Sequence, residues 1–169
     1  LLWGFLGTWT ARFGPMLKRI GSVGSYLRKL RRREPGATFG HSPLAVLSVF
    51  ALLLALTIQV ATGLFSVDVD GLESGPLAVT ISFETGRQFA EVHEFNFNLL
   101  VALIGLHVAA IAFYHFVLKE KLVGAMVTGR RSRADFPEKA LPANRHGLYS
   151  VTAAALLSLA CVIAISNFG

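Results

Sequence analysis

Two histidines stand fourteen residues apart, at positions 93 and 107, in the apolar stretch HEFNFNLLVALIGLHVAAIAFYH. On an α-helix this spacing corresponds to a rise of about 21 Å and falls about 40° short of four full turns, so both imidazole rings leave the same face. A histidine nitrogen is a common axial ligand of haem iron. His93 and His107 are therefore candidate ligands of two haems stacked along one helix.

The spacing alone leaves two other interpretations open. The histidines could be relays of a proton or ion pathway, or polar groups that hydrogen-bond a neighbouring helix. A zinc protease is disfavoured, because the stretch lacks the second histidine of an HExxH motif. His115 lies about 80° from the shared face, and we expect it, with His41 and His146, near the membrane surface.

Polar and small residues surround the two histidines. Asn96 and Asn98 follow His93, and we expect both amides to hydrogen-bond a neighbouring helix. Gly105 and Ala109 flank His107, where small side chains would let a flat macrocycle or a second helix approach closely.

The composition indicates an integral membrane protein. Of the 169 residues, 53% are hydrophobic and only 15% are charged, and the mean hydropathy is +0.57. Three segments without charge are long enough to cross a bilayer: Leu44–Ser66, Phe95–Leu118 and Leu148–Ser166. The single cysteine, Cys161, excludes an internal disulfide, and no CxxCH motif is present to attach haem covalently.

The charges alternate in sign along the chain. Residues 12–33 hold eight Lys and Arg and no acid, and residues 119–145 are also mainly basic. Between them, residues 67–94 hold six acids and one base; we call this the acidic segment. Because cytoplasmic loops are rich in Lys and Arg, residues 12–43 and 119–147 should be cytoplasmic and the acidic segment outside. The net charge of +6 therefore indicates topology and contact with lipid rather than nucleic-acid binding.

Local signals place the ends of the expected helices. A short surface helix is expected at Val23–Arg32 within an otherwise irregular basic connector at 14–36. Ser42 is a suitable N-cap for the first complete span, and proline at position 43 suits the first helical turn. The next helix should begin near Gly86 and the last near Gly147.

Three stretches resemble the bacterial cytochrome b561 family, which includes the b-type cytochrome subunits of nickel–iron hydrogenases. They are LLWGFLGTWTARF at the start of the chain, GHSPLAVLSVFALLLALTIQVATGLF at 40–65, and VHEFNFNLLVALIGLHVAAIAFYHFVLKEKLVGAMVTGRR at 92–131. The third is the most specific, because it contains the histidine pair and basic residues directly after the apolar stretch. The resemblance covers roughly residues 1–131, followed by an expected cytoplasmic linker at 132–147 and an additional transmembrane helix at 148–167.

The resemblance implies an all-α membrane fold, a four-helix transmembrane bundle that holds two b haems with two histidine ligands each. Carried onto this sequence, His93 would ligate the outer haem and His107 the inner one. In the family, the partner ligands come from the first two helices. We expect this chain to lack helix 1 and most of helix 2, to hold spans at about 44–66 and 88–118, and to receive the partner ligands from outside it.

The function implied by the resemblance is electron transfer within a multi-pass protein of the bacterial inner membrane. Electrons would pass between quinone in the lipid bilayer and a redox partner, either a periplasmic cytochrome c or a hydrogenase. The chain would then be an electron-transfer protein or the cytochrome subunit of an oxidoreductase complex. The alternatives are a non-redox membrane anchor subunit and a histidine-lined proton or ion transporter.

The topology can be tested at the centre of the acidic segment. Alkaline phosphatase fused near Ser74 should be active, because the enzyme folds only outside the cytoplasm, whereas a cytoplasmic reporter at the same position should be inactive. Activity of the cytoplasmic reporter alone would contradict the predicted orientation.

Overall fold

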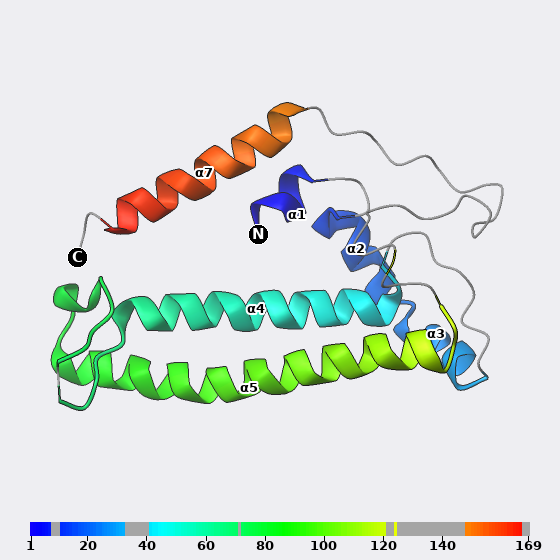
Figure 1. Ribbon diagram of the computed structural model, residues 1–169, viewed down its shortest axis with the longest axis horizontal. Coiled ribbons are helices and arrows are strands. Elements are labelled where there is room, and N and C mark those ends of the chain that lie inside the picture. The colour runs from blue at the N-terminus through cyan, green and yellow to red at the C-terminus, as the bar shows by residue number, and fades with distance from the viewer. Residues whose placement is uncertain (8–10, 33–40, 71, 121–123, 125–147, 167–169) are drawn as a thin grey trace. The chain divides into compact units, whose positions relative to one another are not determined.

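The computed structural model describes residues 1–7, 11–32, 41–70, 72–120, 124 and 148–166 (Figure 1). These residues form α1 (Leu2–Leu6), α2 (Phe13–Ile20), α3 (Val23–Arg31), α4 (Pro43–Phe65), the 3₁₀ helix η1 (Ala78–Thr80), α5 (Phe83–Phe116) and α7 (Leu148–Ser166). An isolated antiparallel bridge joins Val67 and Ser74, and the described residues contain no β-strand. The all-α prediction is confirmed.

The chain divides into two compact units. The first comprises residues 1–50 and 105–151, and the second comprises residues 51–104 and 152–169. Both long helices, α4 and α5, contribute residues to each unit. Each unit therefore contains a stretch of α4 and a stretch of α5.

In the first unit, short amphipathic helices pack aromatic side chains on the start of α4. The ring of Phe13 on α2 contacts Phe5 of α1, with centroids 5.0 Å apart, and Phe50 of α4, with centroids 5.4 Å apart. Met16 of α2 and Tyr26 of α3 are buried. The Tyr26 hydroxyl lies 2.9 Å from the Tyr114 hydroxyl of α5, so α3 is tied to the end of the long helix.

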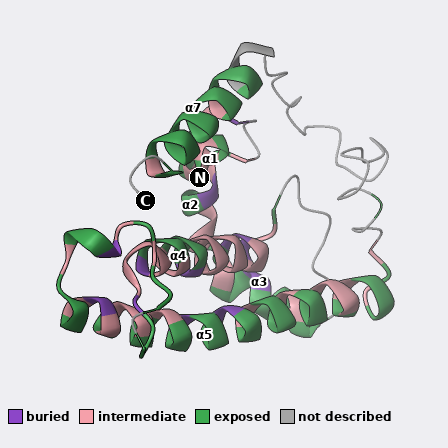
Figure 2. Cartoon of the chain, turned by 60° about the vertical axis from the view of Figure 1, so that its left-hand side comes forward, coloured by how far each residue is buried: buried purple, intermediate pink, exposed green. Residues whose placement is uncertain are grey.

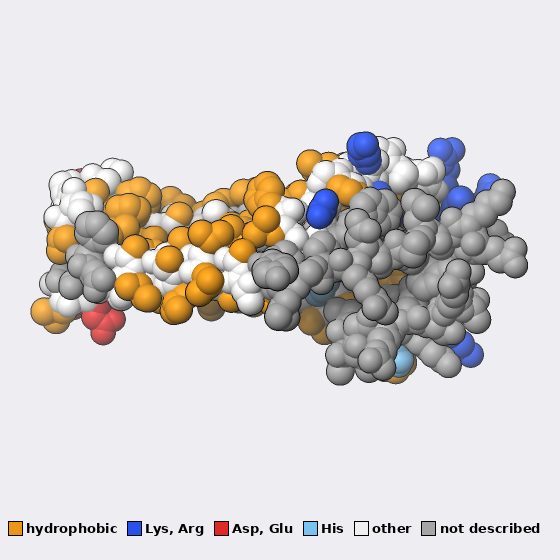
Figure 3. All heavy atoms as spheres, turned by 90° about the horizontal axis from the view of Figure 1, so that it is seen from above, with side chains coloured by type: hydrophobic (Ala, Val, Ile, Leu, Met, Phe, Trp, Pro, Cys, Tyr) orange, Lys and Arg blue, Asp and Glu red, His pale blue; other side chains and the backbone are white. Residues whose placement is uncertain are grey.

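The basic residues of α2 and α3 are exposed apart from Arg19, which is half-buried. Their last turns carry Lys18 and Arg19 in α2 and Arg28, Lys29 and Arg31 in α3. A guanidinium nitrogen of Arg19 donates to the backbone carbonyl of His41, 2.5 Å away, just before α4 begins. Cations at helix C-termini are stabilised by the helix dipole. Figure 3 shows that hydrophobic side chains make up much of the face that it draws outside the grey residues.

In the second unit, residues 66–82 connect α4 to α5 in a short, well-bonded loop. The Leu77 amide donates to the Leu64 carbonyl at 2.9 Å, and the Gly75 amide donates to the Ser66 carbonyl at 2.8 Å. Arg87 at the start of α5 donates to the Val67 carbonyl at 3.0 Å. These bonds close the connection and hold the two helices antiparallel.

Serine side chains cap both long helices. The Ala45 amide donates to the Ser42 hydroxyl at 3.2 Å, so the predicted cap of α4 is confirmed. In α5 the Thr85 amide donates to the Ser82 hydroxyl at 3.3 Å. This cap starts α5 at Phe83, earlier than the predicted start near Gly86.

Both α4 and α5 are long and apolar enough to cross a membrane. Only 11% and 6% of their most apolar windows are buried within the described structure. Figure 2 shows that exposed and half-buried residues dominate both helices. The additional helix α7 has the bounds predicted for it, Leu148–Ser166, and its described side chains from Val151 onward are mostly exposed.

The basic connector expected at 14–36 is more helical than predicted. Residues 14–20 of this connector belong to α2 (Phe13–Ile20), a helix that was not predicted. Gly14 and Pro15 suggested a loop, but both lie in the first helical turn, where an amide donor has no intrahelical partner and proline is tolerated. The expected linker at 132–147, with His146, lies outside the described residues.

The loop of the second unit allows a test of packing. A Cβ atom added at Gly75 would overlap the carbonyl oxygens of Gly63 and Leu64, which belong to α4 and cannot rotate away. Gly75→Ala should therefore cost about 1–3 kcal/mol of unfolding free energy and lower the thermal midpoint in detergent. Gly14→Ala is the control, since its Cβ would meet nothing within 4 Å; equal midpoints for the two variants would refute this packing.

Candidate functional site

His93 extends from α5 and places both ring nitrogens against α4 in the second unit. Its Nδ1 atom lies 3.0 Å from the backbone carbonyl oxygen of Gln59 and 3.2 Å from the hydroxyl of Thr62. Its Nε2 atom lies 2.8 Å from the carboxamide nitrogen of Gln59. Three polar groups of one helical turn of α4 therefore surround the imidazole.

Asn96, one turn further along α5, holds the Gln59 carboxamide in place. Its side-chain nitrogen donates to the backbone carbonyl of Ala55 at 2.9 Å and to Oε1 of Gln59 at 2.6 Å. Asn96 is 3% exposed, so its amide makes these bonds in a site that water does not reach. The expectation that Asn96 bonds a neighbouring helix is confirmed.

The hydrogen-bond directions in this cluster are fixed by backbone carbonyls, which can only accept. The Ala55 carbonyl can be paired only with the NH₂ group of Asn96, which donates to it. The same NH₂ group also donates to Oε1 of Gln59. The NH₂ group of Gln59 then points at Nε2 of His93, and Nδ1 of His93 must carry the proton donated to the Gln59 carbonyl. In this arrangement Nδ1 of His93 is the donor and Nε2 is the acceptor.

A glycine makes room for this ring. A Cβ atom added at Gly63 would lie 2.9 Å from Cε1 and 3.2 Å from Nδ1 of His93. These separations are shorter than ordinary van der Waals contacts, so a larger residue would displace the imidazole from α4. Gly63 therefore allows the close approach on which the bonds to Gln59 and Thr62 depend.

His107 meets α4 in the first unit through the same ring nitrogen. Its Nδ1 atom lies 2.8 Å from the Ser48 hydroxyl. Within the described part of the chain, no hydrogen bond to its Nε2 atom is found. Ser48 and Thr62 are fourteen residues apart on α4, as the histidines are on α5. Because the helices run antiparallel, one register pairs Ser48 with His107 and Thr62 with His93.

The other predicted site residues lie apart from these contacts. The His115 ring packs edge-on against Phe116, with centroids 4.9 Å apart. The contact described above for His41 uses its backbone rather than its ring. The expectation for Asn98 is wrong, because its amide bonds the Glu94 carbonyl of its own helix. A Cβ at Gly105 would meet nothing within 4 Å, so no described helix approaches it.

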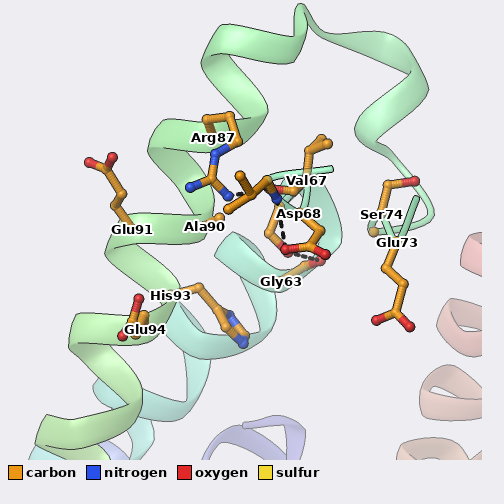
Figure 4. A pocket seen from close by; sticks show the side chains of 13 residues that line it. Gly63, Val67, Asp68, Glu73, Ser74, Arg87, Ala90, Glu91, His93 and Glu94 are labelled. Carbon is orange, nitrogen blue, oxygen red and sulfur yellow. Dashed lines mark hydrogen bonds between the residues drawn. The ribbon is translucent and has the colours of Figure 1, made fainter. Parts of the chain in front are cut away.

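An open cavity of about 510 Å³ adjoins His93 at the loop end of the second unit (Figure 4). Figure 4 shows the His93 ring extending from α5 to α4, with Glu91 pointing away from it. Apart from His93, the ionisable residues that line the cavity are Asp68, Glu73, Arg87, Glu91 and Glu94. The cavity is therefore predominantly acidic at neutral pH.

The Nδ1 contacts of both histidines are compatible with axial ligation of haem iron through Nε2, the atom that Gln59 meets in His93. A ligating imidazole coordinates through one nitrogen and donates its other N–H to a carbonyl or a similar acceptor, which sets the tautomer. His93 has this arrangement on Nδ1, and His107 has a hydroxyl at the same atom. The described residues contain no cluster of three or more His, Cys, Asp and Glu that would indicate another metal site.

Sequence reasoning missed the contribution of α4. Ser48, Gln59 and Thr62 were not identified as partners of the histidines. The available signal was their spacing, because Ser48 and Thr62 repeat the fourteen-residue interval of the histidine pair on a helix without charged residues. Matching intervals on two antiparallel helices predict facing pairs only once the register is known.

A family model described as prokaryotic cytochrome b561 matches residues 1–129, which include α1 to α5 and both histidines. Neither the curated proteins nor the solved structures contain a match.

The buried amide of Asn96 should contribute measurably to the packing of α4 on α5. Asn96→Leu removes the donor to Ala55 and Gln59 and leaves the Gln59 oxygen unpaired, at a cost of about 1–2 kcal/mol. Asn98→Leu makes the same chemical change two residues away at an exposed position and should cost far less. Unfolding of both variants in detergent measures the difference; equal losses would contradict the structural role of Asn96.

Proposed function

Since the chain belongs to the prokaryotic cytochrome b561 family, it is a b-type membrane cytochrome that binds haem b and transfers electrons, and we propose that it carries them between the quinone pool and a redox partner through two haems. His93 and His107 each supply one axial ligand in this proposal. The supporting observation is that α4 contacts Nδ1 of both rings, the nitrogen opposite the one that would bind iron, while Nε2 of His93 also meets Gln59.

The roles of the chain are ligation, orientation and exclusion of water. Haem, when bound, supplies the reversible one-electron iron couple. The residues of α4 hold the imidazole planes, and the apolar helices provide surroundings of low polarity. The histidines are separated by about 21 Å along α5, so two sites at different depths would divide the membrane crossing into shorter electron-transfer steps.

The apolar interval between the histidines favours electron transfer over proton relay. Residues 99–106, with the sequence LLVALIGL, have no polar side chain over about 12 Å of helix. On α4, Thr57 is the only polar side chain between Ser48 and Gln59, and its hydroxyl bonds the Leu53 carbonyl of its own helix. A proton pathway needs a continuous series of ionisable groups or water, whereas electrons pass between separated redox centres.

The acidic segment supports a positively charged partner at the outer face. Six carboxylates and one guanidinium give it a strong negative charge, and four of the carboxylates line the cavity next to His93. Complementary charge increases association rates with a basic protein such as a periplasmic cytochrome c. A hydrogenase subunit is the alternative partner. The proposal also places the protein in the inner membrane as a multi-pass protein.

Substitution of each histidine tests the ligand assignment. His93→Ala and His107→Ala should each remove one haem and leave the other, as counted by pyridine haemochrome on full-length variants purified from membranes in detergent. His107→Ala should be more damaging, because water cannot readily replace a ligand within an apolar interior. His115→Ala is the control and should keep both haems, because its ring packs on Phe116. Full haem content in both the His93 and His107 variants would refute the assignment and favour the relay function.

A further inference from the structure

The Gln59 side chain occupies the one atom of His93 that the proposed function requires to be available. We propose that Gln59 is a positioning residue, which caps Nε2 of His93 in the haem-free protein and competes with iron for its lone pair. This inference rests on the proposed function, because it assigns a role to Gln59 at the outer haem site. Here Gln59 is not a ligand, since its carboxamide nitrogen is a donor without a lone pair to offer.

The cap is built from both helices. Asn96 holds Oε1 of Gln59 from α5, while the NH₂ group of Gln59 reaches Nε2 of His93 at 2.8 Å. Asn96 is buried, so the carboxamide of Gln59 cannot exchange this partner freely for water. The orientation of the cap follows from the Ala55 carbonyl, which can only accept.

The backbone and the side chain of Gln59 act on different nitrogens of the ring. Its carbonyl accepts the Nδ1 proton at 3.0 Å, and its carboxamide donates to Nε2 at 2.8 Å. The first bond maintains the tautomer that ligation requires, and any residue at position 59 can provide it. The second bond must break before Nε2 can coordinate, and only the side chain provides it. A substitution can therefore remove the cap and keep the tautomer.

The cap gives the two sites different properties. His107 has the Ser48 hydroxyl at Nδ1 and, among the described residues, no hydrogen bond at Nε2. His93 has partners at both nitrogens. The cap also gives the Nε2 lone pair of His93 a hydrogen-bond donor between two apolar helices as long as no haem iron is bound. Breaking one hydrogen bond of ordinary net strength reduces apparent affinity about two- to tenfold, so the cap should weaken haem binding at His93 but not at His107.

The state of His93 can be measured without haem. Nuclear magnetic resonance of haem-free protein with ¹⁵N-labelled histidine reports on both ring nitrogens. The His93 signals are the ones that disappear in His93→Ala. They should show a protonated Nδ1 and an unprotonated Nε2 that accepts a hydrogen bond. In Gln59→Leu the Nδ1 proton should remain, and the Nε2 resonance should shift as the hydrogen bond is lost. A proton on Nε2 in the unsubstituted protein, or no change in the variant, would overturn the inference.

Titration of the same haem-free proteins with hemin tests the competition. Gln59→Leu should raise the affinity of the outer site about two- to tenfold and leave the inner site unchanged. Thr62→Val also removes a contact of His93 but keeps the cap, so it should not raise the affinity. Asn98→Leu is the control for an amide-to-leucine change outside the cluster. Unchanged or weaker binding in Gln59→Leu, or an equal gain in Thr62→Val, would overturn the inference.

The two measurements separate this inference from the proposed function. If His93→Ala keeps the outer haem, ligation by His93 is wrong, while the resonance of Nε2 still decides whether Gln59 caps the ring. If His93→Ala loses that haem but Gln59→Leu changes neither the resonance nor the affinity, His93 is a ligand and the cap is refuted.

Discussion

A polar side chain inside an apolar helix pair must find a partner, because neither lipid nor neighbouring apolar groups can replace water. In the second unit His93, Gln59, Thr62 and Asn96 satisfy one another and end on backbone carbonyls of α4. These bonds do more than join two helices. They determine which atoms of the imidazole face α4 and where its proton resides.

The same constraint determines the register of α4 against α5. An apolar helix pair can slide with little loss of contact, because one leucine packs much like another. A hydroxyl that faces an imidazole loses this contact when the helices slide past each other. Two such pairs at equal intervals, Ser48 with His107 and Thr62 with His93, therefore favour a single alignment. Gly63 lets the helices approach closely enough for these bonds to form.

The ends of the long helices serve a different purpose from their interior. Basic residues of α2 and α3 precede α4, and the acidic segment joins α4 to α5, so opposite charges flank the apolar stretch. The cavity next to His93 lies at the acidic end, where a charged partner could approach the proposed outer site. In the proposed function, ligation geometry would depend on the uncharged interior, and orientation and partner choice on the charged ends.

The sequence by itself determined the helical class, the long apolar segments, the cap at Ser42 and the two histidines, because periodicity, composition and helical spacing are local properties of the chain. It also contained the matching interval of Ser48 and Thr62, but an interval on one helix does not specify what faces it. Only the tertiary structure decided that Gln59 and Asn96 meet at His93, that Gly63 admits the ring, and that Asn98 bonds its own helix. The physical reason is that hydrogen-bond direction and close approach depend on the relative rotation and register of two helices, which distant residues fix together.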